Sequence, residues 1–212
     1  MPIINETNIS DAEFTAMQEL ATAYICERAF KDNKRFGSPS DIIKDSKTKS
    51  GLEKIFKKGN KQIFTFSLPI QTKTPEDKWL NTFYLQQKTL LSKFSDSSFT
   101  VFNREGGFMQ FITDLISDKF GVSRKDAWNP ADIWLIRKPM VYRKKILDEL
   151  KGPSGTQTIK ELNSVMRVMF KQKDVVGISL KLISGKQAQY EEINVKEDFF
   201  KHLESGEFDF KL

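Results

Sequence analysis

The chain has one cysteine and one histidine among its 212 residues. A single thiol, Cys26, can build neither a disulfide framework nor a zinc cluster, so we expect a reducing compartment, the cytoplasm. A single imidazole, His202, excludes a histidine-rich metal site and disfavours Ser-His-Asp and Cys-His catalysis. Any chemistry would therefore depend on carboxylates, lysines, hydroxyls and a hard metal ion.

Several other signatures are missing. No apolar run approaches 18 residues and the N-terminus lacks a basic-then-apolar signal, so we expect neither membrane spanning nor secretion. Gly106-Gly107 is not followed by Gly-Lys-Ser or Gly-Lys-Thr, which excludes a phosphate-binding loop there. The GxSxG, CxxC and HExxH patterns are also missing, which disfavours the hydrolases, redox proteins and metalloproteases that use them.

The chain has a composition typical of globular proteins, with 29% charged residues, 39% hydrophobic residues and 18 phenylalanines. This length and composition predict one domain with a real core. The net charge of +6 favours polyanions, chiefly nucleic acid. Lysines gather in residues 44–61, which form either a phosphate-contacting arm or an ordinary solvated loop and helix.

Hydrophobic periodicity predicts a helix-rich first half, followed by strand, two helices, strand, turn and strand. The predicted helices span residues 10–31, 75–94, 108–120, 140–150, 159–172 and 198–203. The predicted strands span residues 98–102, 129–136, 175–182 and 190–195, whereas residues 62–68 form either a strand or an extended linker. Residues 32–50 are read as loop or short helix, and residues 52–56 as one or two helical turns. We therefore expect an α/β (α+β) fold, a central mixed sheet flanked by helices, with an N-terminal helical region over residues 1–106 and a core over about 107–200.

Two of these strands carry polar residues that packing would not select. Asp132 opens an apolar run, and burying a carboxylate is costly unless a cation or local amides satisfy it. Because side chains alternate along a strand, Ser179 and Lys181 share one side and would face Asp132 if the two strands pair. Alternatively, 175–182 is an edge strand with an exposed polar face.

Pro130-Ala131-Asp132 and Ser179-Leu180-Lys181 resemble the PD and (D/E)xK elements of the restriction-endonuclease-like nuclease superfamily. The first element is one residue longer than usual, and the second has serine in place of the acidic residue. The resemblance covers roughly residues 107–195 and makes 140–172 a helical insertion. It implies hydrolysis of DNA phosphodiester bonds with Mg²⁺ or Mn²⁺. Asp132 and a second acid would bind the metal, and Lys181 would orient or deprotonate the attacking water.

The resemblance also suggests where the second acid lies. Members with serine at this position take the acid from a nearby element, and Glu191 and Glu192 follow Lys181 after a turn. The superfamily often uses a glutamate of its first helix, which favours Glu19, although the helical wheel places Glu19 opposite the apolar stripe of that helix. Glu13 lies nearer the stripe but belongs to a capping box with Ser10.

Several basic residues of the chain could contact the expected DNA partner. Those that could follow a DNA backbone, or simply cover solvated surface, are Arg143, Lys144, Lys145, Lys54, Lys57 and Lys58. The resemblance and the small single-domain build favour a phage-, plasmid- or defence-associated protein, and a homodimer is compatible with cutting two strands. Two alternatives remain open. One is a catalytically inactive nucleic-acid-binding member, since Ser179 replaces an acid, and the other is a structural interaction protein.

Overall fold

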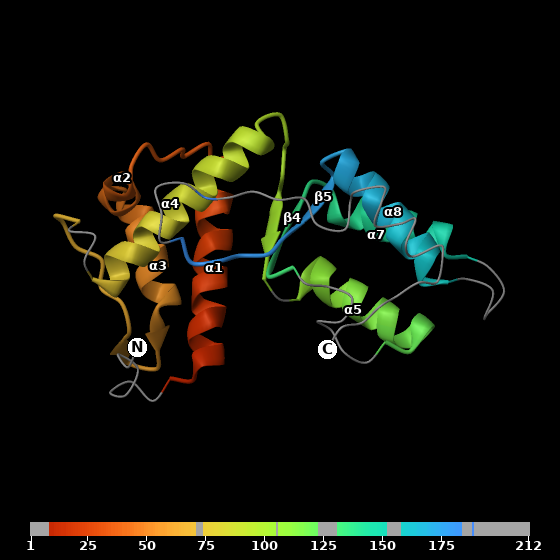
Figure 1. Cartoon of the computed structure of the whole chain (residues 1–212), viewed down its shortest axis with the longest axis horizontal. Helices are drawn as coiled ribbons and strands as arrows, with labels where there is room; N and C mark the ends of the chain where they lie inside the picture. The colour runs from red at the N-terminus through yellow and green to blue at the C-terminus, as the bar shows by residue number, and fades with distance from the viewer. Residues whose placement is uncertain are drawn as a thin grey trace, which may run out of the picture.

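Three short antiparallel strands lie between two groups of helices (Figure 1). The computed structural model describes residues 9–70, 74–104, 106–122, 131–151, 158–183 and 188. The strands are β3 (Val101–Asn103), β4 (Ile133–Ile136) and β5 (Val175–Ile178), in the order β3-β4-β5. One helical group comprises α1 (Asp11–Phe30), α2 (Pro39–Lys44), α3 (Ser46–Ile55) and α4 (Pro75–Lys93). The other comprises α5 (Gly107–Phe120), α7 (Pro139–Glu149) and α8 (Ile159–Lys171).

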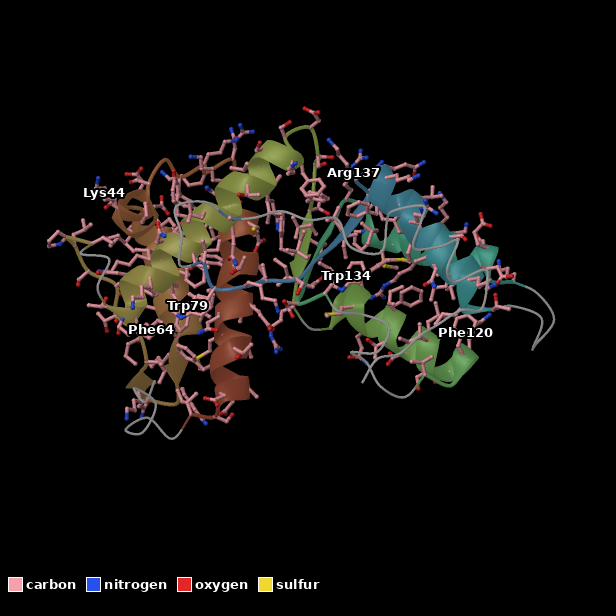
Figure 2. All side chains as sticks on the ribbon, in the orientation of Figure 1. Lys44, Phe64, Trp79, Phe120, Trp134 and Arg137 are labelled. Atoms are coloured by element: carbon pink, nitrogen blue, oxygen red, sulfur yellow. The ribbon has the colours of Figure 1, made fainter. Side chains whose placement is uncertain are left out.

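The central strand β4 is buried on both faces. Ile133 and Leu135 pack in a cluster with residues of α1 and α4, whereas Trp134 and Ile136 pack with residues of α5, α7 and α8. Figure 2 shows Trp134 between the sheet and α5. A strand covered on both faces requires a continuous apolar run, which is why Ile-Trp-Leu-Ile shows no alternation of polar and apolar residues.

Phenylalanines build the core of the first helical group. Phe56 stacks on Phe64 with ring centroids 4.9 Å apart, and Phe66 and Phe83 surround this pair. Figure 2 places Phe64 and Trp79 within this group, away from the sheet. A small hairpin of β1 (Lys57–Lys58) and β2 (Lys61–Gln62) follows α3. Such aromatic pairs add to burial through their edge and face contacts, so this group has a core of its own.

Local signals place most helix ends where the sequence predicted them. Ser10 and Glu13 form the capping box of α1, and α5 ends at Gly121, whose φ of 66° is readily accessible only to glycine. The predictions over 10–31, 75–94, 108–120, 140–150 and 159–172 are confirmed as α1, α4, α5, α7 and α8. Residues 32–50, read as loop or short helix, contain α2 and the first half of α3.

The strands are shorter than predicted. The 129–136 and 175–182 predictions become β4 and β5, the 98–102 run becomes β3, and residues 62–68 are mostly an extended linker. The α+β class is confirmed, but every pair among the described strands is antiparallel, where we expected a mixed sheet. The strand at 190–195 and the helix at 198–203 lie outside the described residues. No helix within the ranges given above is both long and apolar enough to cross a membrane.

Candidate functional site

A β-bulge begins the central strand at Asp132. The Asp132 amide donates to the carbonyl of Ile178 at 2.9 Å, although the register partner of Ile178 is Ile133. Two successive residues therefore oppose Ile178, which is how a bulge is built. Packing agrees, because Ala131 joins the cluster of Trp134 while Ile133 packs on the opposite face, and regular alternation would place Ala131 and Ile133 together. The bulge, which lies at the end of the sheet, changes the direction of the Asp132 side chain relative to a regular strand.

Gly177 makes room for this bulge on the neighbouring strand. A Cβ added at Gly177 would lie 2.9 Å from the Ala131 Cβ and 3.5 Å from Cη2 of Trp134. Carbon atoms normally approach to about 3.5–4.0 Å, so a side chain at 177 would displace Ala131. Glycine in the interior of a strand often marks such a close approach.

The carboxylate of Asp132 contacts the end of β5. Its Oδ2 accepts hydrogen bonds from the Leu180 amide at 2.5 Å and from the Ser179 hydroxyl at 3.2 Å. The predicted pairing of Asp132 with Ser179 is therefore present in the structure. One carboxylate oxygen is satisfied by local donors, while Oδ1 accepts no hydrogen bond from any residue in the described ranges.

Lys181 lies just beyond the end of the sheet rather than within a strand. Its side chain is exposed, and among the described residues it forms no ion pair with Asp132 or any other acid. Its carbonyl accepts a hydrogen bond from Nε2 of Gln86 on α4 at 3.2 Å. The chain after β5 therefore leaves the sheet and passes toward α4 (Figure 1).

Glu19 on α1 reaches the same end of the sheet through Arg104. Oε2 of Glu19 lies 2.6 Å from Nε of Arg104, and both side chains are largely buried. Arg104 directly follows Asn103, the register partner of Trp134, and so lies beside the start of β4. Glu19 and Asp132 therefore approach one sheet end from different elements. Glu13 is separate, because it binds Ser10 and Lys58 in the first turn of α1.

The expected Mg²⁺ or Mn²⁺ site requires a second carboxylate that is able to bind the metal together with Asp132. Across the part of the chain that the structure describes, no group of three histidine, cysteine, aspartate or glutamate side chains could hold a metal ion. Asp132 offers one carboxylate oxygen, and the Glu19 carboxylate is paired with Arg104. Glu191 and Glu192 lie outside the described residues. The described side chains therefore do not by themselves fit a divalent cation.

The basic residues predicted to contact DNA form two separate groups. Lys54, Lys57 and Lys58 are exposed on α3 and β1, and Lys58 pairs with Glu13 at 2.7 Å. The second group lies on α7, on the other side of the sheet (Figure 1). It consists of Arg143, which donates to the Gly107 carbonyl and covers the Phe111 ring, of exposed Lys144 and of half-buried Lys145.

Three residues at this sheet end were not predicted from the sequence: Gly177, Arg104 and Gln86. Gly177 left a signal, a glycine within an apolar strand. Arg104 and Gln86 left none, because their partners come from distant segments of the chain.

No family model, curated protein or solved structure matches this chain.

Proposed function

We propose that this chain is a metal-dependent nuclease that hydrolyses phosphodiester bonds of DNA, with Asp132 as its central acid. The observation that supports this most is the hydrogen bond between Asp132 and Ser179 at the end of two adjacent strands. It brings together the two sequence elements that resemble the PD and (D/E)xK motifs. A carboxylate aimed by a bulge is also typical of active sites, where bulges are over-represented.

In this proposal the two oxygens of Asp132 have separate tasks. Oδ2 is held by the Leu180 amide and the Ser179 hydroxyl, so it orients the carboxylate. Oδ1 is the atom left for a ligand. Lys181 lies one residue beyond the amide that binds Asp132, and its flexible exposed ammonium can reach a phosphate oxygen or a water beside that carboxylate.

The proposed reaction draws on a metal for its Lewis acidity. Mg²⁺ or Mn²⁺ would polarise the phosphate and lower the pKa of a bound water. The second ligand is assigned to Glu191 or Glu192, with Glu19 as the alternative if a substrate phosphate draws Arg104 away from it. The net charge of +6 and the exposed Lys144 would favour contact with the DNA backbone.

A second function is favoured by a specific observation, the engagement of both candidate acids. Oδ2 of Asp132 is satisfied by a backbone amide, and Glu19 is paired with Arg104. Carboxylates satisfied in this way often serve structure alone. The alternative is a catalytically inactive protein that binds nucleic acid or another protein.

The test is cleavage of supercoiled plasmid and linear DNA with Mg²⁺ or Mn²⁺. Asp132→Asn and Lys181→Ala should each lower the rate by at least about 10²-fold, because the first removes the proposed metal-binding charge and the second removes the group proposed to act on the attacking water. Matched controls are Asp118→Ala and Lys160→Ala, which remove exposed charges of the same sign on α5 and α8. Circular dichroism would confirm that each variant is folded.

The outcomes separate the two functions. Equal cleavage by wild type, Asp132→Asn and Lys181→Ala would assign the activity to a contaminant and refute the nuclease. An absence of cleavage, together with metal-independent DNA binding that weakens with salt, would support the inactive binding protein.

A further inference from the structure

Buried polar side chains connect α1 and α4 to the segment that carries Lys181. Thr22, Thr82 and Gln86 are 1%, 0% and 7% exposed. The Thr22 hydroxyl lies 2.9 Å from Oε1 of Gln86, and Nε2 of Gln86 donates to the Lys181 carbonyl at 3.2 Å. Farther along, the Ile183 amide donates to the Thr82 hydroxyl at 3.2 Å. Two side chains of one helix therefore hold the backbone at residues 181 and 183.

These contacts account for polar residues that would otherwise weaken the helix interface. A buried amide costs free energy unless both its ends are hydrogen-bonded. Gln86 meets this condition only with the help of the segment after β5, since Thr22 satisfies its oxygen and Lys181 satisfies its nitrogen. An apolar residue would pack between α1 and α4 without this dependence, so Gln86 serves the segment as well as the helix pair.

The segment is held at both sides of Lys181. The Leu180 amide binds Oδ2 of Asp132, and the Lys181 carbonyl binds Gln86. Because the backbone is held at residues 180, 181 and 183, the position of the Lys181 Cα is fixed relative to the Asp132 carboxylate. Only the four-carbon side chain of Lys181 can then change its conformation.

We propose that Gln86, supported by Thr82, is a positioning residue that holds Lys181 beside Asp132. The inference rests on the proposed nuclease for its catalytic consequence, but its structural component does not depend on activity. Fixing a reacting group near its working geometry lowers the barrier, and a displacement of about 1 Å can cost about 10²-fold in rate.

The neighbouring Gln87 provides a matched control. It is also buried on α4, but its Oε1 accepts from the Phe36 amide at 2.8 Å and its Nε2 donates to the Phe36 carbonyl at 3.4 Å. Gln86→Leu and Gln87→Leu therefore each remove two hydrogen bonds from one helix but release different segments. Thr82→Val tests the second anchor if Gln86→Leu folds poorly.

Two measurements test the proposal. In amide hydrogen exchange, peptides covering residues 180–183 should exchange at least about tenfold faster in Gln86→Leu, roughly the loss of one hydrogen bond, and remain unchanged in Gln87→Leu. In DNA cleavage, Gln86→Leu should lower kcat about ten- to a hundredfold with KM within about twofold of wild type. Gln87→Leu should leave kcat within about twofold.

The structural and catalytic components can fail separately. Unchanged exchange at residues 180–183 in both Gln86→Leu and Thr82→Val would overturn the positioning role, whatever the activity. Equal losses of kcat in Gln86→Leu and Gln87→Leu would reduce Gln86 to a stabilising residue and overturn it as well. If the wild type cuts no DNA, the proposed function and the catalytic consequence fail together, while the exchange data still decide whether Gln86 holds the segment.

Discussion

Gly177→Ala should destabilise the protein by crowding the bulge that aims Asp132. The new methyl group would lie 2.9 Å from the Ala131 Cβ, well inside the normal contact distance of about 3.5–4.0 Å. Overpacking of this kind costs about 1–3 kcal/mol, and the lower entropy of the unfolded chain returns about 0.4–1 kcal/mol. The net loss is about 1–2 kcal/mol, which for a chain of this length lowers Tm by about 2–8 °C.

Ala131→Gly supplies the complementary change, because it removes the atom that the new methyl group would meet. Thermal unfolding of the wild type, both single variants and the double variant forms a double-mutant cycle. We expect the double variant to be more stable than the sum of the single effects, with a coupling of at least about 0.5 kcal/mol. A Gly177→Ala variant as stable as wild type, or strictly additive effects in the cycle, would show that Ala131 and Gly177 do not meet as the bulge requires.

Two further predictions concern titratable groups. Hydrogen bonds from Lys58 and from the amide and hydroxyl of Ser10 lower the pKa of Glu13 from 4.5 to about 2. A lowered folded-state pKa contributes stability above the unfolded pKa, so the advantage of wild type over Glu13→Gln should be constant above about pH 4.5 and fade toward pH 2. Urea unfolding across this range checks it, and a difference that does not vary with pH would contradict it. Complete burial raises the pKa of the Cys26 thiol to about 12. The native protein at pH 8 should therefore react with a thiol reagent far more slowly than the urea-unfolded chain, and equal rates would contradict the burial.

The helices could be predicted because their signals are local. The capping box of Ser10 and Glu13 and the stop at Gly121 lie within a few residues of the ends they set. α3 was only partly predicted because residues 46–51 are polar, and it begins instead where the Asp45 carboxylate accepts from the Thr48 amide. The bulge could not be predicted, because it depends on the register between Ile133 and Ile178 on strands far apart in the chain.

At the candidate site, alternation predicted that Ser179 and Lys181 would both face Asp132, and of these two side chains the structure shows a contact for Ser179 alone. Alternation did not predict that β5 would stop at Ile178, because the partners that draw the chain away lie on α4. Glu19 lies opposite the apolar stripe of α1, yet it is largely buried. The reason is that α1 is covered on two sides, by the phenylalanine cluster around Ala21 and by the sheet around Cys26. A prediction that assumes one apolar face per helix cannot identify a residue that is buried against a second neighbouring element.

The phenylalanine cluster has a consequence for the nascent chain. All its members lie between Phe14 and Tyr84, whereas the sheet joins Val101 to Ile136 and Ile133 to Ile178. On the ribosome, every side chain of that first core is synthesised before any strand of the central sheet. The helical half can therefore collapse on its own residues early, and β4 receives its second covering layer only after translation has passed α8. The surroundings of Asp132 can therefore form only after the residues of this first core have been synthesised.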